Sequence, residues 1–252
     1  MRTLFVLFLR ELRGLFYTPI AYVMLVLFLA FMGVDFWMAV TSLNQVSSEG
    51  TVVDATFFNI LFWIVFPLIF PLMTMRVFSD EYRMGTIESL VTAPVHDWQI
   101  VLAKFFGVLV FYIVLFAPTM FFFAVFKWIS GVDPVPSVGI YWSVSLLLVL
   151  LGMFFLSIGV FASSLVKDQV NAAIISLVTI VLYMFLPSLM GFLLNSTDPR
   201  FGKVREFLSP IDHMRDFARG LVDTRPIVWY VSMTALFLML THQVFQARKL
   251  KN

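Results

Sequence analysis

The sequence predicts an all-α integral membrane protein with six transmembrane helices. Of its 252 residues, 61% are hydrophobic and 13% are charged, whereas a soluble domain needs about a quarter of its residues charged to cover its surface. The mean hydropathy is +0.95. Six stretches also reach the roughly 20 apolar residues that a helix needs to cross the hydrocarbon core of a bilayer.

The six predicted spans belong to one transmembrane domain over residues 1–252. They cover residues 15–40, 56–75, 100–126, 140–166, 170–194 and 227–245. An even number of spans places both termini on one side of the membrane.

The distribution of basic residues predicts that this side is the cytoplasm. With cytoplasmic termini, the inner segments hold ten Lys or Arg residues and the outer segments hold seven, of which six lie in residues 195–226. Without that stretch, which we expect to be a structured outer element, the ratio is ten to one.

Residues 1–14 are predicted to form an amphipathic helix in the cytoplasmic interface of the membrane. Apolar side chains recur on one helical face, and Arg10 and Arg13 lie on another. The apolar face would sink among acyl chains, and the two arginines would anchor the helix at the phosphates. The alternative is that the segment is only the basic flank of the first span. Because charges interrupt its apolar run and no small-residue cleavage site follows, we do not expect a cleaved signal peptide.

The inner loop of residues 76–98 carries an ordered pattern. Ser79 is expected to begin a helix as a hydroxyl cap, followed by Asp80 and Glu81 at the positive end of the helix dipole. Apolar residues then recur at helical spacing as far as Val91, opposite a polar side, and Pro94 is expected to end the helix. Such a helix would lie on the bilayer surface with its polar face towards the cytosol.

Two interpretations of this loop stay open on the residues alone. In the first, the loop only anchors the second and third spans, and Lys104 extends from the third span to the headgroup layer as a further interface anchor. In the second, Glu81, Arg83 and Glu88 form a docking ridge for a soluble partner. A simple connection needs only about five residues, so the length of the loop favours the second interpretation.

The outer segment of residues 195–226 is predicted to form a second amphipathic helix, which lies on the outer surface or dips between the last two spans. Ser209 before Pro210, with Asp212 three residues past the cap, marks a helix start. Gly220 and Pro226 suit its far end. The alternative is a solvated loop with a similar pattern.

Charged residues are scarce within the predicted spans, and prolines occur in three of them. Asp35 lies towards the outer end of the first span, where we expect headgroups to solvate it, and a role in substrate binding is the alternative. Prolines should kink the second, third and fifth spans. Small residues in the fourth and fifth spans favour close helix packing, and they are Ser157, Gly159, Ser163, Ser164, Ala172, Ala173 and Ser176.

The sequence lacks the motifs of several common enzyme and ligand-binding classes. The sequence has no phosphate-binding G-x-x-x-x-G-K-[ST] loop, no H-E-x-x-H metal motif and no G-x-S-x-G nucleophile elbow. It contains no cysteine, which removes disulfides and thiolate metal sites, and its net charge of +2 is too small to indicate nucleic-acid binding. We therefore predict no catalytic, cofactor-binding or metal-binding residues.

The run "DEYRMGTIESLVTAPVHDWQIVLAK" resembles the E-x-R-x-G-T-x-E…P…K signature of ABC-2 type transporter permeases. The chain as a whole is similar to this family in its six spans, its N-terminal helix and its outer amphipathic segment. Within the family, its length and the run "SPIDHMRDFARGLVDTR" are most similar to the gliding-motility and nitrous-oxide-reductase-maturation permeases.

The resemblance implies a coupling helix that seats in a groove of a separate ATP-binding subunit. It implies these docking residues: Ser79, Asp80, Glu81, Arg83, Gly85, Thr86, Glu88 and Pro94. ATP and Mg²⁺ would be bound by the partner subunit, and the chain itself would hold no cofactor. The implied assembly contains two permease copies, identical or different, in the lipid of a bacterial cytoplasmic membrane.

The function implied by the resemblance is a permease that moves a substrate by alternating access. Two alternatives remain on the sequence. A channel or secondary carrier that acts alone would need charged residues within the spans, and these are scarce. A membrane enzyme or a scaffold for an assembly complex is the other alternative.

Overall fold

The computed structural model describes residues 2–45, 51–86, 96–131, 138–194 and 199–249, and this part of the chain contains helices and no strand. Six segments of the described residues are long and apolar enough to cross a membrane. The predicted all-α fold with six spans is therefore confirmed. In chain order, the helices are α1 (Arg2–Phe16), α2 (Pro19–Gln45), α3 (Val52–Phe57), α4 (Ile60–Thr74), α5 (Ser79–Met84), α7 (Asp97–Ser130), α8 (Val138–Leu165), α9 (Gln169–Leu194), α10 (Pro199–Leu208), α11 (Pro210–Ala218) and α12 (Thr224–Lys249).

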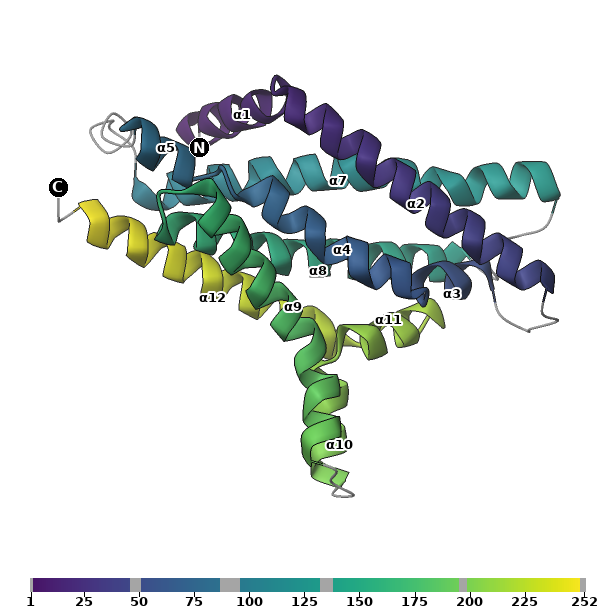
Figure 1. Ribbon diagram of the computed structural model, residues 1–252. Helices are drawn as coiled ribbons and strands as arrows, with labels where there is room; N and C mark the ends of the chain where they lie inside the picture. Colours follow the sequence, from purple (N-terminus) through teal and green to yellow (C-terminus); the bar gives the residue numbers. More distant parts are fainter. Residues whose placement is uncertain (1, 46–50, 87–95, 132–137, 195–198, 250–252) are drawn as a thin grey trace.

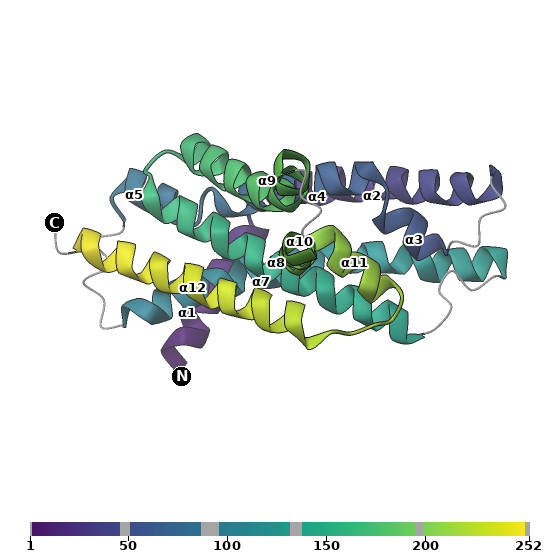
Figure 2. The same cartoon turned by 90° about the horizontal axis from the view of Figure 1, so that it is seen from below.

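The long helices form an elongated bundle with both chain termini towards one end (Figure 1). We call this the terminal end, which also carries α5, and we call the opposite end the far end. The central helix is α8, which packs against α4, α7, α9, α11 and α12. Figure 2 shows it between α9 and α12.

The second span contains α4, which is separated by turns from a short helix before it, α3, and from another after it, α5. At the far end it is preceded by α3, whose start is fixed by a reciprocal capping box between Thr51 and Asp54. Asn59 then caps α4 through a hydrogen bond from the backbone N–H of Leu61. At the terminal end, a turn over residues 75–78 separates α4 from α5. This turn brings polar backbone groups to the site described below.

Small residues on α8 allow the neighbouring helices to approach closely, as the sequence predicts. A Cβ atom on Gly159 would lie 2.0 Å from Thr74 Oγ1, and one on Gly152 would lie 2.3 Å from Tyr112 Cε1. Tyr112 also donates a hydrogen bond of 2.9 Å to the carbonyl of Leu148. The central helix is thus tightly packed against both α4 and α7.

The segment between the fifth and sixth spans contains two helices, α10 and α11, where the sequence analysis identified only the second. The predicted start of α11 is confirmed, because Ser209 Oγ accepts a hydrogen bond of 3.2 Å from the N–H of Asp212. Gly220 has a φ of 78°, which suits the chain reversal after this helix. Pro226 lies instead in the first turn of α12. Figure 1 shows α10 projecting, with the end of α9, away from the other helices.

Asp35 lies in a different environment from the one predicted. Only 1% of its surface is exposed, so headgroups do not solvate it. It occupies the face of α2 that also buries Phe28, Met32 and Ala39, because these positions recur at helical spacing. A core position on this helix is therefore held by a carboxyl group.

Candidate functional site

The candidate site lies at the terminal end, where α5 lies near α1 (Figure 1) and where the turn of residues 75–78 and α5 form hydrogen bonds with α7 and α8. It contains the part of the predicted docking loop that the structure describes. Glu88 and Pro94 belong to the predicted site but lie outside the described residues.

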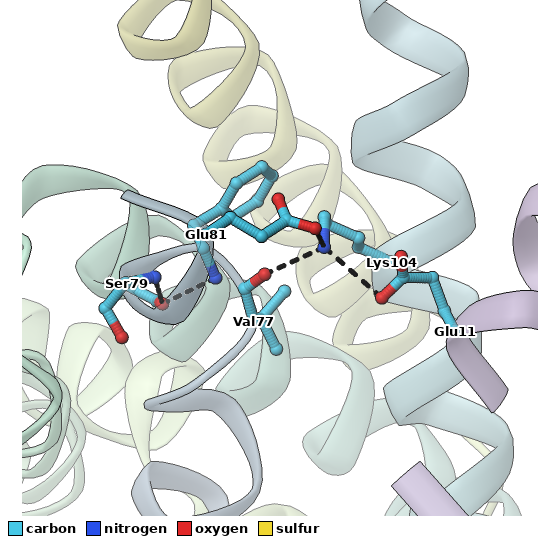
Figure 3. Close-up of polar contacts among 7 residues, drawn as sticks. Glu11, Val77, Ser79, Glu81 and Lys104 are labelled. Atoms are coloured by element: carbon cyan, nitrogen blue, oxygen red, sulfur yellow. Dashed lines mark hydrogen bonds and ion pairs between the residues drawn. The ribbon is translucent and has the colours of Figure 1, made fainter. Parts of the chain in front are cut away.

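A buried lysine on α7 joins three segments of the chain. The Nζ atom of Lys104 lies 2.7 Å from Glu81 Oε1 on α5, 3.2 Å from Glu11 Oε2 on α1 and 2.9 Å from the carbonyl oxygen of Val77. Figure 3 shows the ammonium group between the two carboxylates. The ammonium group also lies over the Phe78 ring, 5.3 Å from its centre, and forms a cation–π contact with it. We call Glu11, Glu81 and Lys104 the buried triad.

The close approach of α1 to α7 makes the triad possible. Gly107 lies one turn after Lys104, and a Cβ atom there would be 3.2 Å from the Cβ atom of Glu11. Glycine at this position leaves room for the backbone of α1, so the side chain of Glu11 reaches the lysine. The interface helix that the sequence predicts is packed along α7, and its Arg10 and Arg13 are exposed.

The position of Lys104 corrects an expectation from the sequence. An anchor in the headgroup layer would leave its ammonium group exposed, but the side chain is only 3% exposed. Two carboxylates and a carbonyl oxygen compensate the buried charge, which makes its burial tolerable. Lys104 therefore ties protein segments to one another.

A serine on α8 holds the start of α5. Ser163 Oγ accepts hydrogen bonds from the backbone N–H groups of Phe78 (3.0 Å) and Ser79 (3.2 Å), and it donates one to the carbonyl of Met75 (3.2 Å). The first N–H groups of a helix have no partner within the helix. A side chain that is 84 positions further along the sequence supplies the partner here.

Ser79 itself does not cap the helix, contrary to the sequence prediction. The cap position belongs to Phe78, and the hydroxyl of Ser79 donates to the carbonyl of Met75. The reason is that the turn after α4 already has helical character, so Ser79 enters α5 as its first helical residue. At the other end, Gly85 adopts a left-handed conformation with a φ of 71°, and α5 ends there. The sequence analysis instead predicted a helix that continues as far as Val91, and residues 87–95, which include Pro94, lie outside the described residues.

The remaining residues of α5 divide between an inner and an outer face. Asp80 is half-buried, accepts a hydrogen bond from Gln169 Nε2 on α9 and lies 3.5 Å from Arg83. The side chain of Arg83 is 63% exposed, and Met84 and Thr86 are also exposed. The exposed surface at the end of α5 is therefore formed by Arg83 and Met84 together with Gly85 and Thr86, which follow the helix, while Ser79 and Glu81 face the bundle.

A cleft of about 520 Å³ lies beside α5, between the turn that joins α8 to α9 and the end of α12. Arg248 on α12 stacks over the ring of Tyr82 at 4.4 Å and donates a hydrogen bond to the carbonyl of Leu165. The exposed face of α5 therefore continues onto the ends of α8 and α12. The turn adds Lys167 and Asp168 to the lining of the cleft.

The sequence analysis missed two functional residues of this site. Glu11 was noted only as an interruption of an apolar run, and Ser163 only as a small packing residue. A carboxylate on an otherwise apolar helix was a usable signal for Glu11. No local pattern distinguishes Ser163 from the neighbouring Ser164, which bonds within its own helix.

Ion pairs and hydrogen bonds connect α5 to α7, α8 and α9, and through Lys104 to α1. The described residues hold no cluster of three metal-ligating side chains. A family model described as ABC-2 family transporter protein matches residues 5–250. No curated protein matches the chain.

Proposed function

The chain belongs to the ABC-2 family of transporter proteins, and we propose that it is the permease subunit that receives force from a separate ATP-binding subunit through α5. The observation that carries this proposal is the bracing of α5. A helix of six residues is fixed at its start by Ser163 and along its length by the buried triad. A displacement of its outer face would therefore move the helices behind it.

The proposed direction of force follows from the contacts. Pressure on Arg83 and Met84 would pass through Glu81 to Lys104 on α7 and to Glu11 on α1. It would also pass through the backbone of residues 78 and 79 to Ser163 on α8. Packed helices transmit such displacements as rigid bodies. These contacts support a shift of the bundle between inward-facing and outward-facing states.

The proposal includes an assembly and an orientation. Two permease copies, identical or different, would bind two ATP-binding subunits in a bacterial cytoplasmic membrane. The terminal end would face the cytoplasm, where ATP is available. The excess of basic residues in the segments assigned to that side supports this orientation.

ATP hydrolysis by the reconstituted complex tests this function. The chain is co-expressed with ATP-binding subunits of its own organism, and the complex is purified into lipid nanodiscs. We expect ATP hydrolysis that depends on the permease and falls when Arg83 is changed to Glu. Transport of a cargo by the purified chain alone, with no ATP-binding subunit, would contradict the proposal.

A further inference from the structure

Asp35 places a carboxyl group inside an apolar helix interface. The residue lies eight positions before Leu43, which is about 12 Å along the helix axis, and 1% of its surface is exposed. It shares its buried helix face with Phe28, Met32 and Ala39, and the next residue, Phe36, packs against Phe122 and Phe123 of α7. Water and lipid headgroups therefore do not reach this carboxyl group.

The carboxyl group also lacks the partners that an ionised aspartate requires. Among the described residues, the polar group beside the Asp35 carboxyl is the side-chain amide of Asn59, at the junction of α3 and α4, and it offers at most one weak hydrogen bond. The Oδ1 atom of Asn59 already accepts the N–H of Leu61.

No described cation compensates a negative charge at this position. The helices that pack against α2 are α1, α3, α4 and α7. Their titratable groups near the far end are Asp54 on α3, which accepts bonds from Thr51, and Lys127 on α7, which is exposed. The charged groups of α1, with Asp97 and Lys104 of α7, lie at the terminal end, and α4 contains no charged residue.

We propose that Asp35 is a proton-binding site and that it carries its proton, as a neutral carboxylic acid, in the packed state of the protein seen here. Burial of an ionised carboxylate with no cation and at most one weak donor is costly, whereas the protonated group is tolerated. One carboxyl group and one amide offer too few oxygen ligands for a metal ion. A proton is therefore the ligand that this geometry fits.

The bound proton depends on the packing of α2 against α3 and α4. Any movement that admits water to this junction stabilises the ionised form, so opening of the junction releases a proton. By the same linkage, an alkaline medium favours the open junction. The proton site needs no ATP and no partner subunit. The proposal for Asp35 can therefore be tested independently of the proposed permease function.

Infrared spectroscopy tests the protonation directly. The full chain is produced with carbon-13 at the side-chain carboxyl of aspartate, which separates its signals from those of glutamate, and is placed in lipid nanodiscs. Spectra are recorded near pH 7, where an exposed aspartate is ionised because its pKa is about 4. We expect a carbonyl stretch from one protonated aspartate, and we expect Asp35→Asn to remove it completely.

The matched control is Asp223→Asn, because Asp223 is exposed and lies after α11. This variant should leave the protonated band unchanged. Asp35→Ser provides a second, smaller replacement if Asp35→Asn does not fold. Absence of the band from the wild-type protein, or its survival in the Asp35 variants, would overturn the proposal. Loss of the band on addition of Na⁺ would also overturn it, because the site would then bind a cation in place of the proton.

Discussion

The Lys104 ammonium group lies 2.7 Å from the carboxylate of Glu81, although 23 positions separate the two residues. Both residues belong to the sequence run that resembles the family signature. Their contact shows what that spacing achieves in three dimensions, because it fastens α5 to the start of α7. Glu11 completes the arrangement from α1.

Removal of the lysine should destabilise the terminal end. In Lys104→Met, two neighbouring carboxylates would remain half-buried without a cation. Loss of one partner from a buried ion pair costs 3–5 kcal/mol, and we expect about 2 kcal/mol here because both carboxylates keep some access to solvent. Unfolding midpoints measured in mild detergent by thermal denaturation would show this loss.

Two further substitutions should restore part of the stability that Lys104→Met loses. Adding Glu11→Gln and Glu81→Gln to Lys104→Met removes both uncompensated charges, so part of the lost stability should return. Arg83→Gln is the matched control, since its ion pair with Asp80 is exposed and should be worth less than about 1 kcal/mol. Equal effects of the Lys104 and Arg83 substitutions would contradict the buried triad.

Ser163→Ala should loosen the start of α5. The substitution leaves the N–H groups of Phe78 and Ser79 without their acceptor, at a cost of about 1–3 kcal/mol for buried groups. Hydrogen exchange at these two amides should become faster. The control is Ser164→Ala, which is equally buried but removes only a bond to the carbonyl of Phe161 within the same helix. Unchanged exchange at residues 78 and 79 would argue against the role of Ser163.

Gly159→Ala should disturb the contact between α8 and α4. Its new methyl group would lie 2.0 Å from Thr74 Oγ1, and overpacking of this kind costs about 1–3 kcal/mol. Gly33→Ala is the control on α2, because nothing lies within 4 Å of the corresponding Cβ position. That variant should be neutral or slightly more stable. A thermal midpoint that falls equally in both variants would contradict the close packing.

The stability of the outer segment should depend on the protonation of His213. This histidine is buried on α11, 2.8 Å from the hydroxyl of Tyr230, and burial lowers its pKa below the usual 6.5, although nearby aspartates oppose the shift. The unfolded chain therefore binds this proton more readily than the folded chain. Its contribution is fully present above pH 6.5 and is lost as the pH falls towards the folded pKa.

A pH series of thermal midpoints measures this effect. One such group accounts for at most about 1.4 kcal/mol per pH unit. The expected decline on acidification should be smaller in His213→Phe and unchanged in His96→Gln, since His96 is exposed. An identical acid response in the wild type and His213→Phe would contradict this assignment.

The parts of the fold that the sequence predicted correctly rest on local signals. Long apolar runs determined the spans, and the cap at Ser209 depends on residues within one turn. The predictions that were wrong, for Ser79, Lys104 and Asp35, concern side chains whose partners lie in distant segments. Hydropathy alone places a lysine or an aspartate at a membrane surface, whereas tertiary packing buries these two. The resemblance to a particular permease subgroup stays a prediction.

The most direct test of the central claim asks whether α5 meets an ATP-binding subunit on the cytoplasmic side. The chain contains no cysteine, so Arg83→Cys and, at the far end, Trp128→Cys each provide one exposed thiol for a maleimide that cannot cross membranes. We predict that Arg83→Cys is labelled only in inside-out vesicles and is protected when the ATP-binding subunit is co-expressed, while Trp128→Cys is labelled only from the other side and is never protected. Labelling of Arg83→Cys from the outside, or labelling that the bound subunit does not reduce, would contradict the claim.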